Sequence, residues 1–274
     1  MTHRGDREHG WALVTGASGG IGEEIARDLA ARGWNLVLTA RREAKLEGLA
    51  EEFRAAAGVE VLILPADLSE PGASGALLGD LKRLDIHVEI LVNNAGIGHY
   101  GEYLKRDLED HEALLTLNVH AVMVLLRGLV PGMVDRGRGR VLNVASTAAF
   151  QPGPLMASYY ASKAFMLSLS EALRDELRMT GVTVTTLCPG PTRSDFHVRA
   201  GMRSSPLVTT VPIPSSRSVA RYGVRAMLRG KGIAVPGLPN RLHLLALRFM
   251  PRGLVPGIVR RVQQTRREES ASGP

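Results

Sequence analysis

The sequence has a single cysteine, Cys188, and aromatic residues make up only 4% of its 274 residues. One cysteine excludes an internal disulfide and indicates a reducing compartment. The first ten residues are polar and lack the apolar core of a secretory signal. No apolar run approaches the roughly 18 residues of a membrane span. We therefore expect a soluble, cytoplasmic protein.

Metal and nucleic-acid signatures are also missing. The eight histidines show no i, i+4 pair of the kind that binds zinc on a helix, so we expect no metal. The net charge is +7, and residues from Arg193 onward carry 15 Lys and Arg against 3 Asp and Glu. No aromatic-rich platform accompanies this basic charge, so we expect no nucleic-acid partner.

What is present is a regular alternation of apolar strands and helices. We expect strands at 11–15, 35–39, 59–64, 88–92, 140–145, 182–187 and 232–235, and helices at 43–57, 72–84, 110–134, 157–179 and 216–229. This order predicts a single doubly wound Rossmann-type domain, α/β in class, with a parallel sheet of about seven strands and helices on both faces. Such a fold collects the residues that follow each strand along one crevice.

The first strand runs into a glycine-rich turn, Gly16 to Gly22, and then into a helix. Glycines at 16, 20 and 22 allow a tight turn and a close approach of a pyrophosphate to the main chain at a helix N-terminus. We expect Ser18 and Ile21 in the same turn to contact the cofactor that carries this pyrophosphate. The alternative is a tight turn without a ligand.

The second strand ends at Thr39 and is followed by Arg41 and Arg42. An acid at this place accepts a hydrogen bond from the ribose 2′-hydroxyl, whereas arginine suits a 2′-phosphate. The absence of an acid favours NADP(H) over NAD(H). The alternative is that both arginines merely begin a solvated helix.

Tyr159 and Lys163 lie four residues apart in a predicted helix, so both side chains leave from the same face. An ammonium beside a phenol favours the phenolate, so we expect the pKa of Tyr159 below its ordinary value of about 10. A tyrosine of this kind can act as general acid or base. Tyr160 points about 100° away around the helix. By itself, the spacing occurs by chance in unrelated helices.

Taken together, the motifs resemble those of the short-chain dehydrogenase/reductase family, in its subclass of about 250 residues. The matching residues are Thr15-Gly16-x-x-x-Gly20-Ile21-Gly22, Asp67, Asn93-Asn94-Ala95-Gly96, Asn118, Ser146, Tyr159-x-x-x-Lys163 and Pro189-Gly190-x-Thr192. The resemblance implies a catalytic tetrad of Asn118, Ser146, Tyr159 and Lys163 with NAD(P)(H) as cofactor. It also implies a homo-dimer or tetramer built on the two long helices, 110–134 and 157–179.

The resemblance also assigns roles. Ser146 would polarise the substrate oxygen, and Lys163 would tune Tyr159 and hold the nicotinamide ribose. Further cofactor contacts would come from Asp67, Leu68, Asn94, Ala95, Gly96, Pro189, Gly190 and Thr192. Two of these residues could instead have a purely local role, because Asn94 and Thr192 could each cap a turn without contacting a cofactor.

The leading interpretation is an NADP(H)-dependent oxidoreductase that interconverts a carbonyl and a secondary alcohol. Its rival is a non-catalytic NADP(H)-binding regulatory protein on the same fold. We expect residues 1–239 to form the catalytic domain, with a substrate lid at about 193–215.

Residues 240–274 would form a basic and apolar C-terminal extension. Its apolar segments, 242–250 and 254–262, are interleaved with arginines and are too short to span a bilayer. They would cover a lipophilic substrate, contact a membrane peripherally or pack in a dimer. The last segment, 268–274, is expected to be disordered.

Overall fold

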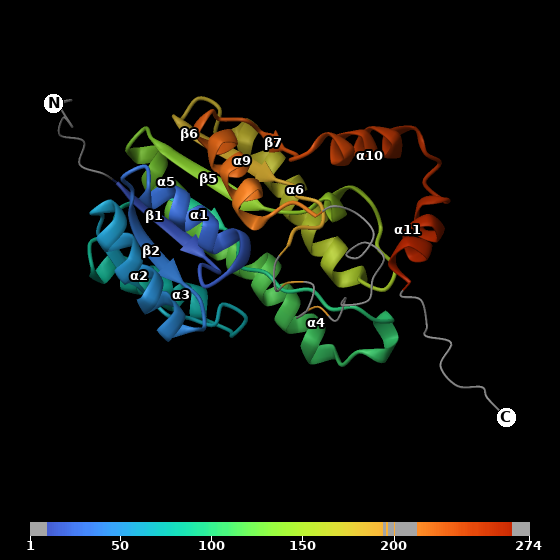
Figure 1. The fold of residues 1–274 in the computed structure, drawn as a ribbon, viewed down its shortest axis with the longest axis horizontal. Coiled ribbons are helices and arrows are strands. Elements are labelled where there is room, and N and C mark those ends of the chain that lie inside the picture. Colours follow the sequence, from blue (N-terminus) through green and yellow to red (C-terminus); the bar gives the residue numbers. More distant parts are fainter. Residues whose placement is uncertain (1–9, 194–195, 197–199, 201–212, 265–274) are drawn as a thin grey trace.

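At the centre of the computed structural model, which describes residues 10–193, 196, 200 and 213–264, is a sheet of seven strands (Figure 1). The strands are β1 (Trp11–Thr15), β2 (Asn35–Thr39), β3 (Val61–Ile63), β4 (Val88–Asn93), β5 (Gly139–Val144), β6 (Val182–Leu187) and β7 (Ile233–Ala234). Their order is β3-β2-β1-β4-β5-β6-β7, and every neighbouring pair is parallel. The strand order reverses between β1 and β4, which confirms the predicted doubly wound sheet.

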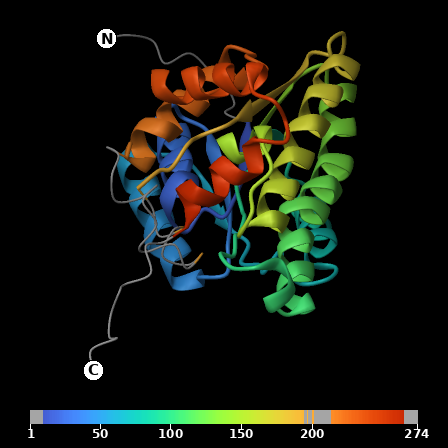
Figure 2. The same cartoon turned by 90° about the vertical axis from the view of Figure 1, so that its right-hand side faces the viewer.

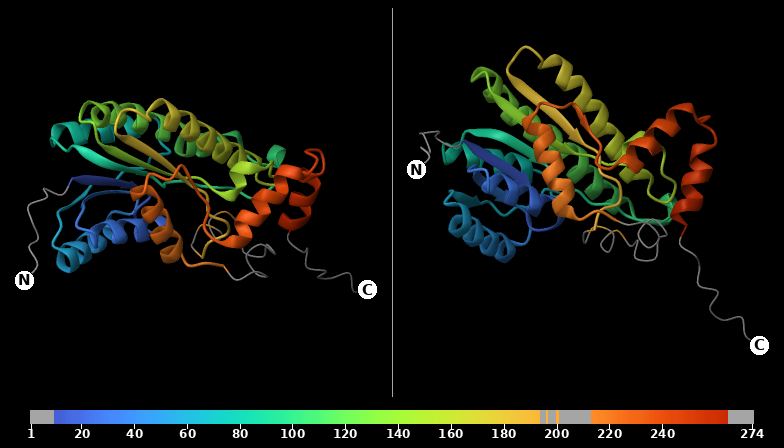
Figure 3. Two further views of the ribbon diagram at one scale, coloured as in Figure 1. Left: turned by 90° about the horizontal axis from the view of Figure 1, so that it is seen from above. Right: turned by 45° about the horizontal axis from the view of Figure 1, so that its top comes forward.

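Helices cover both faces of the sheet, as the view from above shows (Figure 3). One face carries α1 (Gly20–Ala30), α2 (Glu43–Ala57) and α9 (Ser216–Leu228); the other carries α3 (Ala73–Arg83), α5 (Ala121–Asp135) and α6 (Ala157–Glu176). Alternate strand residues supply the two cores: Val14 and Leu38 pack with α1 and α2, while Leu13 and Val37 face the opposite layer. Apolar side chains on both strand faces therefore bury the sheet between two helical layers.

The long helix predicted over 110–134 is in fact three joined pieces. It begins earlier, as α4 (Leu108–Leu115), passes through a π-helical turn at Thr116–His120, and continues as α5. The segment Leu108–Asp135 is by length and composition apolar enough to cross a membrane, because one window of 18 residues within it has a mean hydropathy of 1.8. The expectation that no segment approaches this limit is therefore wrong. In this fold α5 packs against α3 and the central strands, as a core helix does.

Two helices follow the last strand and form one end of the molecule (Figure 2). They are α10 (Leu238–Phe249) and α11 (Val255–Gln263). The helix α10 begins two residues before the predicted start of the extension, and the domain boundary itself stays a prediction. Most of the predicted lid at 193–215, and the whole of 268–274, lie outside the described residues.

Candidate active site

A cavity of about 1350 Å³ lies at the carboxyl ends of the strands, where the strand order reverses between β1 and β4. That is more than the roughly 300–1000 Å³ of a single small-ligand site. Its lining includes nearly every predicted cofactor residue: Gly16, Ser18, Gly20, Ile21, Arg41, Arg42, Asp67, Leu68, Asn94, Ala95, Gly96, Tyr159, Lys163, Pro189, Gly190 and Thr192. Ser146 also lines it, whereas Gly22 and Asn118 lie behind the wall. The cavity has room for a dinucleotide and a second molecule.

The glycine turn after β1 is held against the end of β4. The Asn94 side-chain amide donates to the Thr15 carbonyl at 2.9 Å and to the Gly16 carbonyl at 3.2 Å. Gly16 has a left-handed φ of 65°. A Cβ on Gly22 would lie 2.4 Å from the Gly16 carbonyl oxygen. Only glycine fits these two positions, and the turn leaves the N-terminus of α1 open to an anionic group.

The arginines after β2 line the same side of the cavity. The Arg42 guanidinium donates to the Ser18 carbonyl at 2.6 Å, so it closes over the glycine turn. The Arg41 guanidinium lies 3.5 Å from the Asp67 carboxylate and remains 60% exposed. Both arginines follow shortly after β2, at the strand end where the sequence has no Asp or Glu. The residues present fit a dinucleotide, whose anionic phosphates guanidinium groups bind well.

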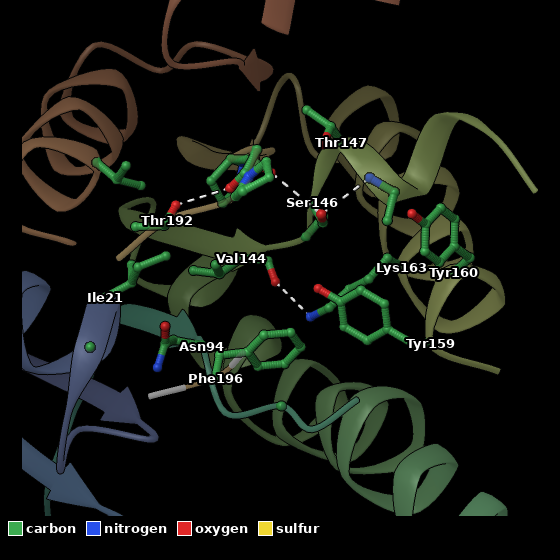
Figure 4. Close-up of a pocket in the computed structure, with 18 of the residues that line it drawn as sticks. Ile21, Asn94, Val144, Ser146, Thr147, Tyr159, Tyr160, Lys163, Thr192 and Phe196 are labelled. Carbon is green, nitrogen blue, oxygen red and sulfur yellow. Dashed lines mark hydrogen bonds between the residues drawn. The ribbon is translucent and has the colours of Figure 1, made fainter. Parts of the chain in front are cut away.

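Tyr159 and Lys163 enter the cavity from the N-terminal part of α6 (Figure 4). The Lys163 ammonium donates to the Val144 carbonyl at 2.9 Å and lies 5.7 Å from the centroid of the Tyr159 ring. The centroid of the Phe196 ring is 5.3 Å from that of the Tyr159 ring. Tyr160 turns away, and its hydroxyl accepts a hydrogen bond from Gln263.

The predicted lowering of the Tyr159 pKa is wrong. Burial of the phenol raises its pKa, and the hydrogen bond with Ser146 only partly offsets this. Burial also lowers the pKa of Lys163 to about 8. At neutral pH Tyr159 is therefore a neutral phenol beside an ammonium, which suits a proton donor rather than a base.

Ser146 follows β5 directly. Its hydroxyl accepts from the Ala148 amide at 3.1 Å and donates to the Pro189 carbonyl at 3.4 Å. The bond to Pro189 connects Ser146 to the loop after β6, where the Thr192 hydroxyl donates to the Gly190 carbonyl at 3.0 Å. Ser146, Tyr159 and the loop at 189–192 thus meet around one space (Figure 4).

Asn118 lies in the π-helical turn and is fully buried. Its amide donates to the Ile97 carbonyl at 2.9 Å and to the Ser162 hydroxyl at 3.0 Å. Its carbonyl oxygen accepts from the Ile97 amide at 3.0 Å. Asn118 therefore joins the turn to the loop after β4 and to α6, and it supports the site from behind the cavity wall.

Residues that sequence reasoning had not assigned to the site come from the C-terminal helices. Leu247, Met250, Val255 and Val259, on or between these helices, wall the second half of the cavity together with Met156 and Phe196 from earlier in the chain. Gln263, at the end of α11, is fully buried and donates to Tyr160, while its carbonyl accepts from the Tyr100 hydroxyl at 3.0 Å. The amphipathic spacing of residues 254–262 was the signal for such a wall. An apolar compartment thus adjoins Tyr159.

Sequence comparisons point the same way as this geometry. The family model described as short chain dehydrogenase matches residues 10–203. A very-long-chain 3-oxoacyl-CoA reductase of Pyrenophora tritici-repentis is 38% identical over 254 residues, covering 89% of this chain and 72% of that protein. A protein of the same name from Phaeosphaeria nodorum is 38% identical over 181 residues, covering 64% of this chain. The match spans only about half, 52%, of that second relative.

Solved structures share the fold across almost the whole chain. A short-chain dehydrogenase from Sphingobium yanoikuyae in complex with NADPH has a TM-score of 0.79 and 32% identity, covering 96% of this chain and 99% of that one. A short-chain dehydrogenase/reductase from Burkholderia phymatum in complex with NAD has a TM-score of 0.76 and 26% identity, covering 88% and 92%. Similar structures therefore hold either nicotinamide dinucleotide.

Proposed function

Because this chain belongs to the short-chain dehydrogenase/reductase family, we propose that it interconverts a carbonyl and a secondary alcohol with NADP(H). The observation that supports this most is the meeting of Ser146, Tyr159 and Lys163 at one wall of a cavity large enough for two molecules. A protein that only binds a dinucleotide has no need of a neutral phenol next to a buried ammonium.

The residues have separable roles in reduction. The Ser146 hydroxyl donates to the carbonyl oxygen and orients it. Tyr159 then gives its proton to the oxygen as negative charge develops there. The Lys163 ammonium stabilises the phenolate that remains. When bound, the cofactor supplies the hydride.

Arg41 and Arg42 support the preference for NADP(H). An extra phosphate at the end of β2 would meet two guanidinium groups, and Arg41 would exchange its contact with Asp67 for the phosphate. The NADPH complex of the Sphingobium yanoikuyae structure is consistent with this choice.

We propose a lipophilic ketone as the substrate. The compartment beside Tyr159 is walled by apolar side chains of α6, α10 and α11. The curated relatives named 3-oxoacyl-CoA reductases suggest a 3-oxoacyl thioester as one such ketone. Each methylene that enters this compartment is worth about 0.8 kcal/mol, so kcat/KM should rise about fourfold per added methylene in a ketone series. A flat series would contradict a lipophilic pocket.

The test of catalysis compares Tyr159→Phe with Tyr160→Phe in NADPH oxidation over a panel of ketones. Loss of the general acid should lower kcat/KM at least 100-fold in Tyr159→Phe. Tyr160→Phe removes a neighbouring phenol whose partner is Gln263, and it should stay within a few-fold of wild type. Binding of NADPH, followed by its fluorescence, should persist in both variants.

The rival function predicts a different pattern. A regulatory NADP(H)-binding protein would bind NADPH but oxidise none of the ketones, and Tyr159→Phe would change neither property. Equal rates for wild type and Tyr159→Phe would also end the catalytic assignment.

We further propose a cytoplasmic homo-oligomer. Its interface would use α4, α5 and α6, because Leu115 and Met123 are 44% and 47% exposed along that side. Light scattering of the purified protein would measure the oligomeric state, and a monomer would contradict it.

A further inference from the structure

The helix α10 carries an apolar stripe that points away from the cavity. Leu238, Leu242, Leu245 and Phe249 recur at spacings of four, three and four residues, which places them on one helical face. They are 64%, 56%, 51% and 82% exposed. The opposite face, with Leu247 and Met250, lines the cavity. No residue of α10 is buried, so its outer stripe does not serve the core.

A second apolar strip lies on α11 and at the cavity rim. Leu254, Ile258 and Val262 are 59%, 44% and 43% exposed, and the last two also line the cavity. Together, α10, α11 and Leu254, which directly precedes α11, hold seven of the fourteen exposed large apolar side chains found among the described residues. The end of the molecule formed by these two helices, which face the viewer in Figure 2, therefore carries apolar side chains up to the cavity lining.

The charge of this end has one sign. Exposed arginines flank the apolar strips at 241, 248, 252, 260 and 261. The sequence has no Asp or Glu between residues 196 and 267, and no carboxylate pairs with these five arginines in the described part of the chain. Apolar side chains bordered by unopposed arginines complement an anionic lipid surface.

We propose that α10 and α11 dock this protein peripherally on an anionic membrane surface, with the cavity mouth facing the lipid. A helix of twelve residues is about 18 Å long, too short to cross a bilayer core of about 30 Å, so α10 lies in the interface. A lipophilic substrate would pass from the lipid past Ile258 and Val262 into the cavity. A second copy is a poorer occupant, because a two-fold pairing brings like-charged arginines together.

Vesicle flotation of the full chain tests this directly. We expect binding to phosphatidylcholine–phosphatidylglycerol (3:1) vesicles at 0.1 M salt to exceed binding to phosphatidylcholine alone at least tenfold, and to weaken at 1 M salt. Leu242→Ser with Phe249→Ser should lower binding at least tenfold. Arg248→Gln with Arg261→Gln should lower it about fivefold for each arginine.

Matched controls place the same changes on other surfaces. Leu104 and Met179 are 93% and 88% exposed elsewhere, and Leu104→Ser with Met179→Ser should stay within twofold of wild type. Arg217→Gln with Arg225→Gln, on α9, should stay within threefold. Turnover of a water-soluble ketone should be unchanged in the Leu242/Phe249 variant, which verifies that the variant is folded.

Three outcomes would overturn the proposal. They are failure of the wild type to bind anionic vesicles, loss of binding in the α9 variant rather than the α10 variants, and conversion of a dimer to a monomer by Leu242→Ser with Phe249→Ser. The last would assign the surface to a second copy. None of these readouts depends on whether the protein is an enzyme.

Discussion

The substitution Asn118→Ala tests whether Asn118 supports the geometry of the site in addition to the stability of the fold. The substitution removes three hydrogen bonds, two with the Ile97 main chain and one with Ser162. At about 1 kcal/mol net for each bond, the free energy of unfolding should fall by about 3 kcal/mol. By the usual scaling for chains of this size, Tm should drop by about 6–12 °C.

The same change should cost activity while the protein is still folded. The Ile97 loop borders the cavity and Ser162 precedes Lys163, so both walls of the site lose their common anchor. A displacement of about 1 Å costs on the order of 100-fold in rate, and we expect kcat/KM at 20 °C to fall by that factor in Asn118→Ala.

The matched control is Asn143→Ala. Asn143 is also fully buried; it accepts from Asn93 at 2.9 Å and donates to Ser170 at 2.8 Å, away from the Ile97 loop. With two bonds lost rather than three, it should lower Tm by about 4–8 °C yet keep kcat/KM within about threefold. Thermal unfolding and ketone reduction measured on the same preparations decide the matter. A folded Asn118→Ala that retains full activity, or an Asn143→Ala that loses as much, would refute the reasoning.

Three further predictions concern proton transfer and the cofactor. Burial lowers the pKa of Lys163 from its ordinary 10.5 to about 8, so its ammonium is present below pH 8 and lost above it. The rate of ketone reduction should therefore decline with a one-proton slope as the pH rises past 8. A rate that does not change up to pH 10 would contradict the role of Lys163. Arg41→Asp should lower the NADPH/NADH ratio of kcat/KM at least tenfold, whereas Arg83→Asp on α3 should leave it unchanged; an unaltered ratio in Arg41→Asp would discredit the 2′-phosphate contact. Gly22→Ala should weaken NADPH binding at least tenfold, because the added Cβ has no room in the glycine turn. Gly48→Ala on α2, where no atom lies within 4 Å of the added Cβ, should bind NADPH normally. Equal affinities of the two variants for NADPH would contradict a role of the glycine turn in binding.

The alternation of apolar strands and helices was sufficient to predict the sheet. Each of the seven predicted strands corresponds to an observed one within about two residues at either end. That the predicted cofactor residues line one cavity could also be inferred from the sequence, because parallel strands place the residues that follow them at one edge of the sheet. Gly16, Arg41 and Asn94 meet for this reason.

What the sequence could not provide depends on burial and on contacts distant in the chain. The i, i+4 spacing of Tyr159 and Lys163 predicts that they are neighbours, but the pKa of the phenol depends on the apolar wall that surrounds it. Asn118 lies in the π-helical turn, and its side chain bonds to Ile97, which is 21 residues away. Gln263 reaches Tyr160 across 103 residues, and no local pattern indicates that contact.

The central claim is that Tyr159 protonates the substrate oxygen while Ser146 holds it. A crystal structure of the complex with NADPH and a bound ketone would test this most directly. We predict that Tyr159 Oη and Ser146 Oγ each lie about 2.6–3.2 Å from the ketone oxygen. A ketone oxygen beyond hydrogen-bond reach of Tyr159, or a nicotinamide bound away from it, would contradict the account.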